Sequence, residues 1–242
     1  MLAVLSVEAR KLNRSLALVL ATAAPSLIAV FLFFNILRGK PPGPPWEMLM
    51  QSSAGIWAFF MLPMSVTALT ALVAHMEHGP KSWDHLRALP VSRWKLYAAK
   101  ALCVLAIVAA MSAAVLGMAW LSATAATAIK PELAPTGPLD LMHHARTLTM
   151  ILGASLLLIA IQLWTALRFS SFVPGLAVGI GGTFFAVVAT SAKQGVFLPW
   201  QMPVNMMASE AWRVQTALAL GGGLGLVALI AMVVHLARRE VL

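Results

Sequence analysis

Charge and cysteine are both scarce in this chain. Of its 242 residues only 10% are charged, whereas soluble domains carry about 25%. The single cysteine, Cys103, excludes an internal disulfide and any metal site built from several cysteines. It lies in an apolar run, so we expect a buried thiol. Because 60% of the residues are hydrophobic and the mean hydropathy is +0.86, the composition indicates a protein embedded in lipid.

Six apolar blocks are long enough to cross a bilayer, which takes about 20 residues in a helix. Almost no charge interrupts them, and all eight acidic residues fall in the links or at the ends. The sequence therefore predicts an all-α integral membrane protein that forms one domain over residues 1–242. The expected transmembrane helices are residues 16–37, 51–74, 96–127, 148–167, 172–192 and 215–236.

The lack of carboxylates within these blocks argues against several classes of transport protein. Proton pumps and many ion-coupled transporters place paired or acidic side chains inside the membrane. Here the polar groups that remain are serines, threonines, Gln162 and His75. We expect these to form hydrogen bonds between helices.

Basic residues are distributed unequally between the links. Eleven of the 17 lysines and arginines fall at the two ends of the chain and in the links after the second and fourth blocks, and six fall in the other links. Because cytoplasmic links are richer in Lys and Arg, this distribution predicts that both termini are cytoplasmic. The basic residues are separated by apolar blocks, and no nucleic-acid-binding arm is expected.

Glycines recur at four-residue spacing in the last two blocks. Four-residue spacing places small residues on one face of a helix, where two backbones can approach closely. We expect tight helix packing there, within one chain or between two. The glycines concerned are Gly175, Gly179, Gly221 and Gly225.

Familiar catalytic and cofactor motifs do not fit. The sequence "GPKS" at residues 79–82 lacks the spacing of a phosphate-binding loop, so we expect no ATP site in this chain. The histidines and acids between His75 and His85 match no standard zinc spacing. The adjacent pair His143 and His144, near Asp140, is expected to be solvated because neighbouring helical side chains diverge. We therefore expect no metal site and no catalytic residue. An intramembrane enzyme is kept as an alternative hypothesis for the function.

The densest polar stretch is "EHGPKSWDHLRALPVSRWKLYAAK", residues 77–100. Ser82 is suited to cap a short helix, and Pro90 to end it. Trp83, Leu86 and Leu89 recur at helical spacing and form one apolar stripe. This pattern leaves two interpretations open. The helix lies on the membrane surface, or it docks on a cytosolic partner.

This stretch resembles the cytoplasmic loop of ABC-2 type transporter permeases. That family carries an acidic residue and a glycine, then a Leu-Pro-[VT]-[ST]-[RK] turn and a lysine that opens the third helix. Ser6–Ser15 is similar to the family's interfacial elbow, with Glu8, Lys11 and Arg14 at the matching positions. "FLPWQMP" at 197–203 resembles the lantibiotic and bacitracin immunity-type permeases, a subgroup tied to antimicrobial peptide resistance. The matching residues of the loop are Glu77, Gly79, Leu89, Pro90, Val91, Ser92, Arg93 and Lys100.

The resemblance implies a fold and a set of partners. It implies an elbow at 1–15, a six-helix bundle at 16–242, and a coupling helix in the cytoplasmic loop 75–95. Two copies of a cytosolic ABC ATPase would bind ATP and Mg, and this chain would bind no cofactor. A second permease chain, identical or related, would complete the transporter in a bacterial inner membrane. The implied contacts with the ATPase are Glu77, Gly79, Trp83, Leu86, Leu89, Pro90 and Arg93.

The function implied is coupling of ATP hydrolysis to transport, with export the expected direction. The apolar helices favour an amphipathic peptide, an antibiotic or a lipid-like cargo. Three alternatives remain open at this point: a secondary transporter driven by an ion gradient, a membrane scaffold that transports nothing, and an intramembrane enzyme.

Overall fold

The computed structural model describes residues 1–78 and 91–238. Its regular elements are helices, and the only β-type pairing among the described residues is an isolated bridge between Pro45 and Thr136. The predicted all-α architecture is confirmed. The α-helices are α1 (Leu2–Asn13), α2 (Leu16–Leu37), α3 (Trp46–Ile56), α4 (Leu62–His78), α6 (Arg93–Ile129), α7 (Leu141–Ala154), α8 (Leu156–Arg168), α9 (Val173–Val188), α10 (Ala211–Leu218) and α11 (Gly225–Arg238).

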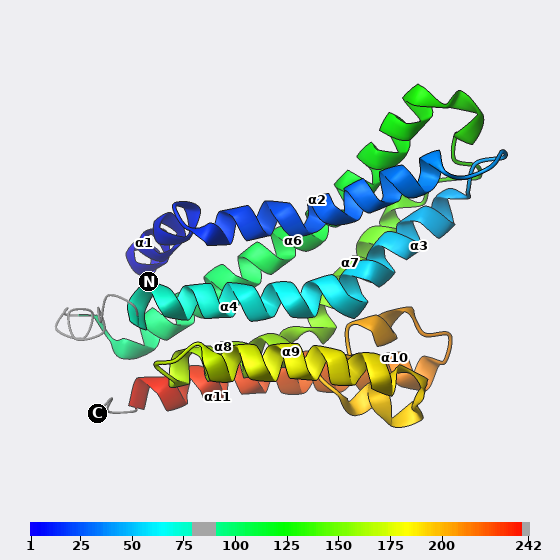
Figure 1. The fold of residues 1–242 in the computed structure, drawn as a ribbon. Helices are drawn as coiled ribbons and strands as arrows, with labels where there is room; N and C mark the ends of the chain where they lie inside the picture. Colours follow the sequence, from blue (N-terminus) through cyan, green and yellow to red (C-terminus); the bar gives the residue numbers. More distant parts are fainter. Residues whose placement is uncertain (79–90, 239–242) are drawn as a thin grey trace.

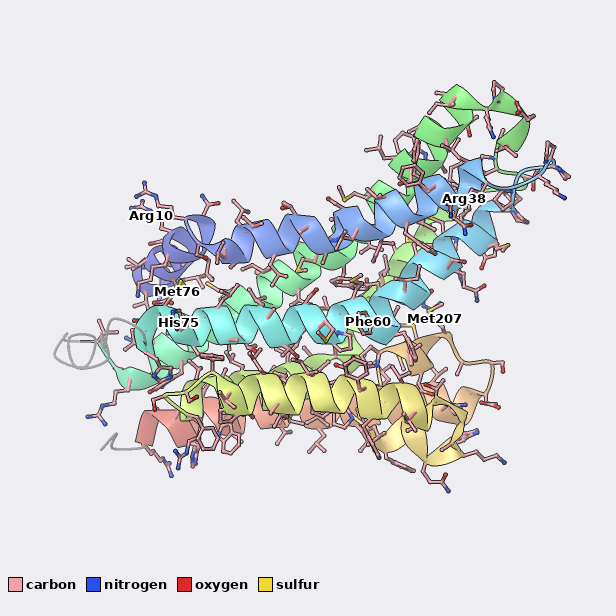
Figure 2. The ribbon with its side chains drawn as sticks, viewed as in Figure 1. Arg10, Arg38, Phe60, His75, Met76 and Met207 are labelled. Atoms are coloured by element: carbon pink, nitrogen blue, oxygen red, sulfur yellow. The ribbon has the colours of Figure 1, made fainter. Side chains whose placement is uncertain are left out.

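The helices form an elongated bundle with two distinct ends (Figure 1). α6 packs along α2, while α8 packs against α4, α9 and α11. The helix α1, the end of α4 and the end of α11 lie at one end of the bundle, which we call the termini end. The loop after α2 and the start of α3 lie at the other, the distal end (Figure 1). Figure 2 shows Arg10 and His75 at the termini end, and Arg38 and Met207 at the distal end.

Four helical stretches in the described residues are long and apolar enough to cross a membrane, namely Leu16–Leu37, Trp46–His78, Arg93–Ile129 and Ala211–Arg238. A fifth arises if α7 and α8, which are bent by 42° at Ser155, count as one span. α9 has only 16 residues. It is shorter than the usual span of about 20. The six predicted blocks are all helical, but the count of six spans is not confirmed.

α6 is unusually long, and its 37 residues extend about 55 Å at 1.5 Å per residue. A hydrocarbon core is about 30 Å thick, so one helix of this length reaches beyond it. The sequence predicted a long third block, and the structure shows one uninterrupted helix. α6 thereby links the two ends of the bundle.

The stretch Trp46–His78 contains a single widened turn, η1 (Trp57–Met61), between α3 and α4. The cause lies in Pro63, which has no N–H to donate to the preceding turn and whose ring crowds that turn. A π-type turn absorbs this mismatch without ending the helix. Trp57 in this turn is fully buried, and its Nε1 donates a hydrogen bond to Ser112 Oγ of α6 at 3.1 Å.

A second widened turn, η6 (Ala219–Leu224), joins α10 to α11. Gly221 lies so close to α7 that a Cβ there would collide with the carbonyl of Ala154. Gly225 is equally close to the backbone of Leu156 and Leu157 at the start of α8. The glycine-rich turn therefore packs directly on the bend between α7 and α8.

The two proline-rich loops of the distal end pair with each other. Trp46 N donates to Thr136 O at 3.0 Å, and Thr136 N donates to Pro44 O at 3.2 Å. Beneath them, Ile36, Leu49, Ala123, Ala126 and Leu133 form a small hydrophobic cluster separate from the main core. This pairing fixes where α3 begins relative to the segment that leads into α7.

The segment 193–207 folds into short 3₁₀ turns, η4 (Lys193–Phe197) and η5 (Val204–Met207). Gln201, Met202 and Asn205 are buried, and the Gln201 amide donates to the carbonyl of Ala186 on α9. The segment is thus folded onto the bundle by side-chain hydrogen bonds that its apolar composition did not reveal.

Candidate functional site

Three helices meet at the termini end and bring charged side chains together. Glu8 and Leu12 lie one turn apart on the buried face of α1, which packs against α6. Ser15 separates α1 from α2. Its Oγ accepts from Ala17 N at 3.1 Å and donates to Leu12 O at 2.8 Å. This cap changes the chain direction and lets α1 lie against the start of α6 and the end of α4.

Four ion pairs among the described residues join these helices, and we call them the ion-pair network. Lys100 of α6 lies 2.7 Å from Glu8 Oε2 and 2.8 Å from Glu77 Oε1. Lys11 of α1 lies 2.8 Å from Glu77 Oε1 and 3.2 Å from Glu8 Oε1. Each lysine therefore contacts both carboxylates, and each carboxylate contacts both lysines.

Burial makes this arrangement energetically important. The relative exposure is 0% for Lys100, 1% for Glu77 and 2% for Glu8. Removing charges from water is expensive, and the cost is offset only when partners and hydrogen bonds are well placed. Two carboxylates and two ammonium groups cancel, so the four side chains together carry no net charge. The network is therefore tolerable where any one of its charges alone would not be.

Lys11 is the partly exposed member. Burial lowers its pKa, but the hydrogen bond to Glu77 and the charges of Glu8 and Glu77 outweigh this, so the net pKa is raised above 10.5. A raised lysine pKa means that its stabilising contribution is complete below 10.5 and is lost as the pH rises through the raised value. At neutral pH Lys11 is therefore protonated and carries a positive charge.

Comparison with known families decides the class of protein. A family model described as ABC-2 family transporter protein matches residues 4–188, which is more than half of the chain. The chain belongs to this family. Neither a curated protein nor a solved structure gave a match. Together with the apolar helices, the family establishes an ABC-2 type permease and a multi-pass membrane protein.

The matched region of this ABC-2 permease contains the whole ion-pair network. The sequence resemblance picked out Glu8 and Lys11 in the elbow, Glu77 before the loop and Lys100 after it, but as separate motif positions. The structure brings all four into direct contact. No pattern in the sequence pairs residues that are 66 and 92 positions apart. The available signal was Lys100 itself, because an ionisable residue at the edge of an apolar helix demands a partner.

The predicted ATPase contacts differ in whether the structure describes them and in whether they are exposed. Gly79, Trp83, Leu86, Leu89 and Pro90 lie outside the described residues. Arg93 is exposed at the first position of α6, and Arg14 is exposed at the end of α1. Glu77, by contrast, is buried and held by two lysines. Direct contact of Glu77 with an ATPase stays a prediction.

The four predicted packing glycines all face other helices of the same chain. A Cβ at Gly175 would be in ordinary van der Waals contact with Ala166 of α8, whereas a Cβ at Gly179 would collide with the Thr67 side chain of α4. Gly221 and Gly225 contact the α7–α8 bend as described above. Gln162 of α8 is also buried here. With its amide oriented to satisfy both groups, it donates to Gly175 O at 3.2 Å and accepts from Gly179 N at 3.0 Å.

The immunity-type subgroup is not confirmed. The segment that suggested it, residues 197–203, lies beyond the matched residues 4–188. Its side chains serve the fold, since Gln201 bonds to α9 and Asn205 Oδ1 accepts from Arg213 Nε at 2.9 Å. Substrate class therefore rests on other arguments.

Proposed function

We propose that this permease couples ATP hydrolysis by a separate cytosolic ATPase to the export of an amphipathic peptide, antibiotic or lipid-like molecule. The observation that carries the proposal is the family match over residues 4–188. The sequence offers no phosphate-binding loop of its own, which supports an ATPase on another chain. The cargo class is supported by helices that offer apolar surface and few charges.

The ion-pair network supports a specific hypothesis for how the motion of such an ATPase reaches the membrane helices. Residues 79–90 connect α4 to α6, and the network binds both of these helices to α1 at that end. A force applied to the connection would move the three helices as one body. We propose that the network is a positioning device, which holds the end of α4 and the start of α6 in a fixed arrangement with α1.

The proposed complex has two permease chains and two ATPase subunits in a bacterial inner membrane, with both termini in the cytoplasm. The excess of basic residues in the links near the termini supports this orientation. The termini end of the bundle would then face the ATPase, and the distal end would face outward.

The direct test uses the residues proposed to contact the ATPase. Trp83→Glu and Leu86→Glu place a carboxylate on the predicted apolar stripe, so we expect each to lower recovery of a co-expressed ATPase at least about tenfold. A carboxylate must be desolvated to enter an apolar contact, which is costly. The measurement is co-purification from membranes, with ATP hydrolysis of the recovered complex as a second readout.

The matched control is Ile129→Glu, an exposed apolar residue at the distal end of α6. It adds the same charge far from the proposed contact and should leave recovery of the ATPase unchanged. Equal recovery with all three variants would contradict the docking proposal. Transport that stops on collapse of ion gradients but survives depletion of ATP would favour a secondary transporter, and no stable partner at all would favour a scaffold.

A further inference from the structure

A second group of titratable side chains lies at the distal end, far from the ion-pair network. It comprises Glu47 in the first turn of α3 and His143 and His144 in the first turn of α7, and we call it the His–His–Glu cluster. The sequence placed the two histidines with Asp140 and treated them as solvated. In the structure Asp140 caps α7 instead, accepting from His143 N at 2.9 Å, and the Glu47 carboxylate lies near Nε2 of both histidines, whose rings are in edge contact.

Local geometry explains why these residues meet. The hydrogen bonds of Trp46 and Thr136 hold the start of α3 against the loop that precedes α7. The Asp140 cap then sets the direction of the first turn of α7. Both anchors hold backbone N–H groups in place, so the positions from which the three side chains project are fixed.

The distances match a small cation held by three protein ligands. His144 Nε2 lies 3.3 Å from Glu47 Oε2, and His143 Nε2 lies 3.9 Å from Glu47 Oε1. One ligand atom from each residue falls within 4.8 Å of the other two. Ligands about 2.0–2.2 Å from a tetrahedral zinc ion are about 3.3–3.5 Å apart. The distance between Glu47 Oε2 and His144 Nε2 already has this value. The His143 side chain is exposed, so its ring can rotate to shorten the distance between His143 Nε2 and Glu47 Oε1.

A second observation, independent of the distances, indicates that His144 binds an ion. Its relative exposure is 5%, and its Nε2 is shielded from solvent yet makes no hydrogen bond. Glu47 Oε2 is near, but not in hydrogen-bonding geometry. A buried polar atom is normally paired, and one left unpaired calls for an explanation such as an ion. A metal at the centre of the cluster would accept the lone pair of this nitrogen.

The surroundings favour one class of metal. The cluster opens on a cavity of about 200 Å³ that is also lined by Gln51, Thr147, Met206 and Met207. Imidazole and carboxylate ligands suit borderline transition metals, whereas Mg²⁺ and Ca²⁺ prefer sites built wholly from oxygen. The cavity leaves room for water or an anion as a fourth ligand, as in zinc sites with three protein ligands.

We propose that Glu47, His143 and His144 form a binding site for a divalent transition metal of the zinc class, which bridges α3 and α7 at the distal end. The site ties together the two helices that follow the paired proline-rich loops. It is independent of the ATPase contact proposed above, because it lies at the opposite end of the bundle.

The test is equilibrium dialysis of the full-length protein in lipid nanodiscs against Zn²⁺, using an affinity tag free of histidine. We expect saturable binding of one Zn²⁺ per chain. His144→Gln and Glu47→Gln should each weaken it at least about tenfold. His143→Gln, at an exposed position that should not disturb folding, should weaken it as well. Mg²⁺ at the same concentration should not compete.

His75→Gln is the matched control, because His75 is exposed at the termini end and far from the cluster (Figure 2). It should bind Zn²⁺ as the wild type does. Failure of the wild type to bind Zn²⁺ saturably would overturn the proposal. So would unchanged binding by the folded His143→Gln variant and by the triple variant Glu47→Gln/His143→Gln/His144→Gln.

Discussion

At the scale of single residues, Lys100 is the one lysine or arginine that is buried in the described part of the permease. It is wholly buried, and its ammonium group lies between two buried carboxylates. Without it, Glu8 and Glu77 would each lose a buried ammonium partner, and the interior would carry one positive charge fewer. Breaking a buried pair is costly for this reason, even where the intact pair itself adds little stability.

We expect Lys100→Met to lower the free energy of unfolding by about 3–5 kcal/mol, the usual cost of leaving a buried charge without its partner. Methionine fills a similar volume, so lost packing contributes little. The measurement is denaturant-induced unfolding of the purified protein, followed by tryptophan fluorescence.

The double variant Lys100→Met/Glu77→Gln tests the electrostatic cause. It restores charge balance, because Glu8 then pairs with Lys11, and should recover part of the lost stability. Lys95→Met, at a half-exposed position in the first turn of α6, is the control and should change stability by less than about 0.5 kcal/mol. A double variant less stable than Lys100→Met alone would contradict the interpretation.

At the scale of elements, the interrupted helices are shaped by their neighbours. The η6 turn fits over the α7–α8 bend because Gly221 and Gly225 present no side chain to the backbone of residues 154–157. The η1 turn accommodates Pro63 within a stretch of helix that runs from Trp46 to His78. These interruptions keep the packing close without ending the span.

We expect Gly221→Val to displace α11 from α8, since any Cβ at this position meets the carbonyl of Ala154. Overpacking of this kind typically costs about 1–3 kcal/mol, and more where the obstacle is backbone. The measurement is the unfolding temperature in detergent, together with the yield of monodisperse protein.

Gly223→Ala is the matched control within the same turn, because a Cβ there meets nothing within 4 Å. It should leave the unfolding temperature unchanged or raise it slightly, since alanine favours helix over glycine. Equal destabilisation by both substitutions would show that the turn needs glycine for its backbone and not for the close approach.

The same elements show how far sequence reasoning reaches. Apolar length located all six helical blocks, and the four-residue glycine spacing located a close packing face. The break at Ser155 and the short α9 were not predicted, because both depend on which helices pack against them. The ion-pair network and the His–His–Glu cluster each join residues far apart in the chain, and periodicity carries no information about such pairs. Glu47 in particular looked like an ordinary residue of a loop.

At the scale of the whole molecule, charge is divided between the two ends of the bundle. The basic residues near the termini end outnumber those of the distal links, which predicts a cytoplasmic termini end. Orientation decides which end of the bundle can meet a cytosolic ATPase. It also decides on which side of the membrane the His–His–Glu cluster lies. It therefore links both proposals to one measurable property.

Orientation can be measured with single cysteines in a Cys103→Ala background, using a maleimide that cannot cross the membrane. Lys40→Cys and Glu132→Cys, both exposed at the distal end, should be labelled in intact cells. Asn13→Cys, exposed at the end of α1, should be labelled only after permeabilisation. The reverse pattern would contradict the predicted topology.

The ion-pair network also has a consequence for the order in which the chain assembles. Its contacts span 23, 66 and 92 residues of sequence, and a chain made from its N-terminus supplies Lys100 last. Until α6 emerges, Glu8 and Glu77 lack the one lysine that is wholly buried between them. During early synthesis α1 therefore lacks the ion pair with Lys100 that holds it in place. It docks on α6 only after this third long helical stretch has begun to enter the membrane. Completion of the N-terminal half of the permease would be marked by this late docking step.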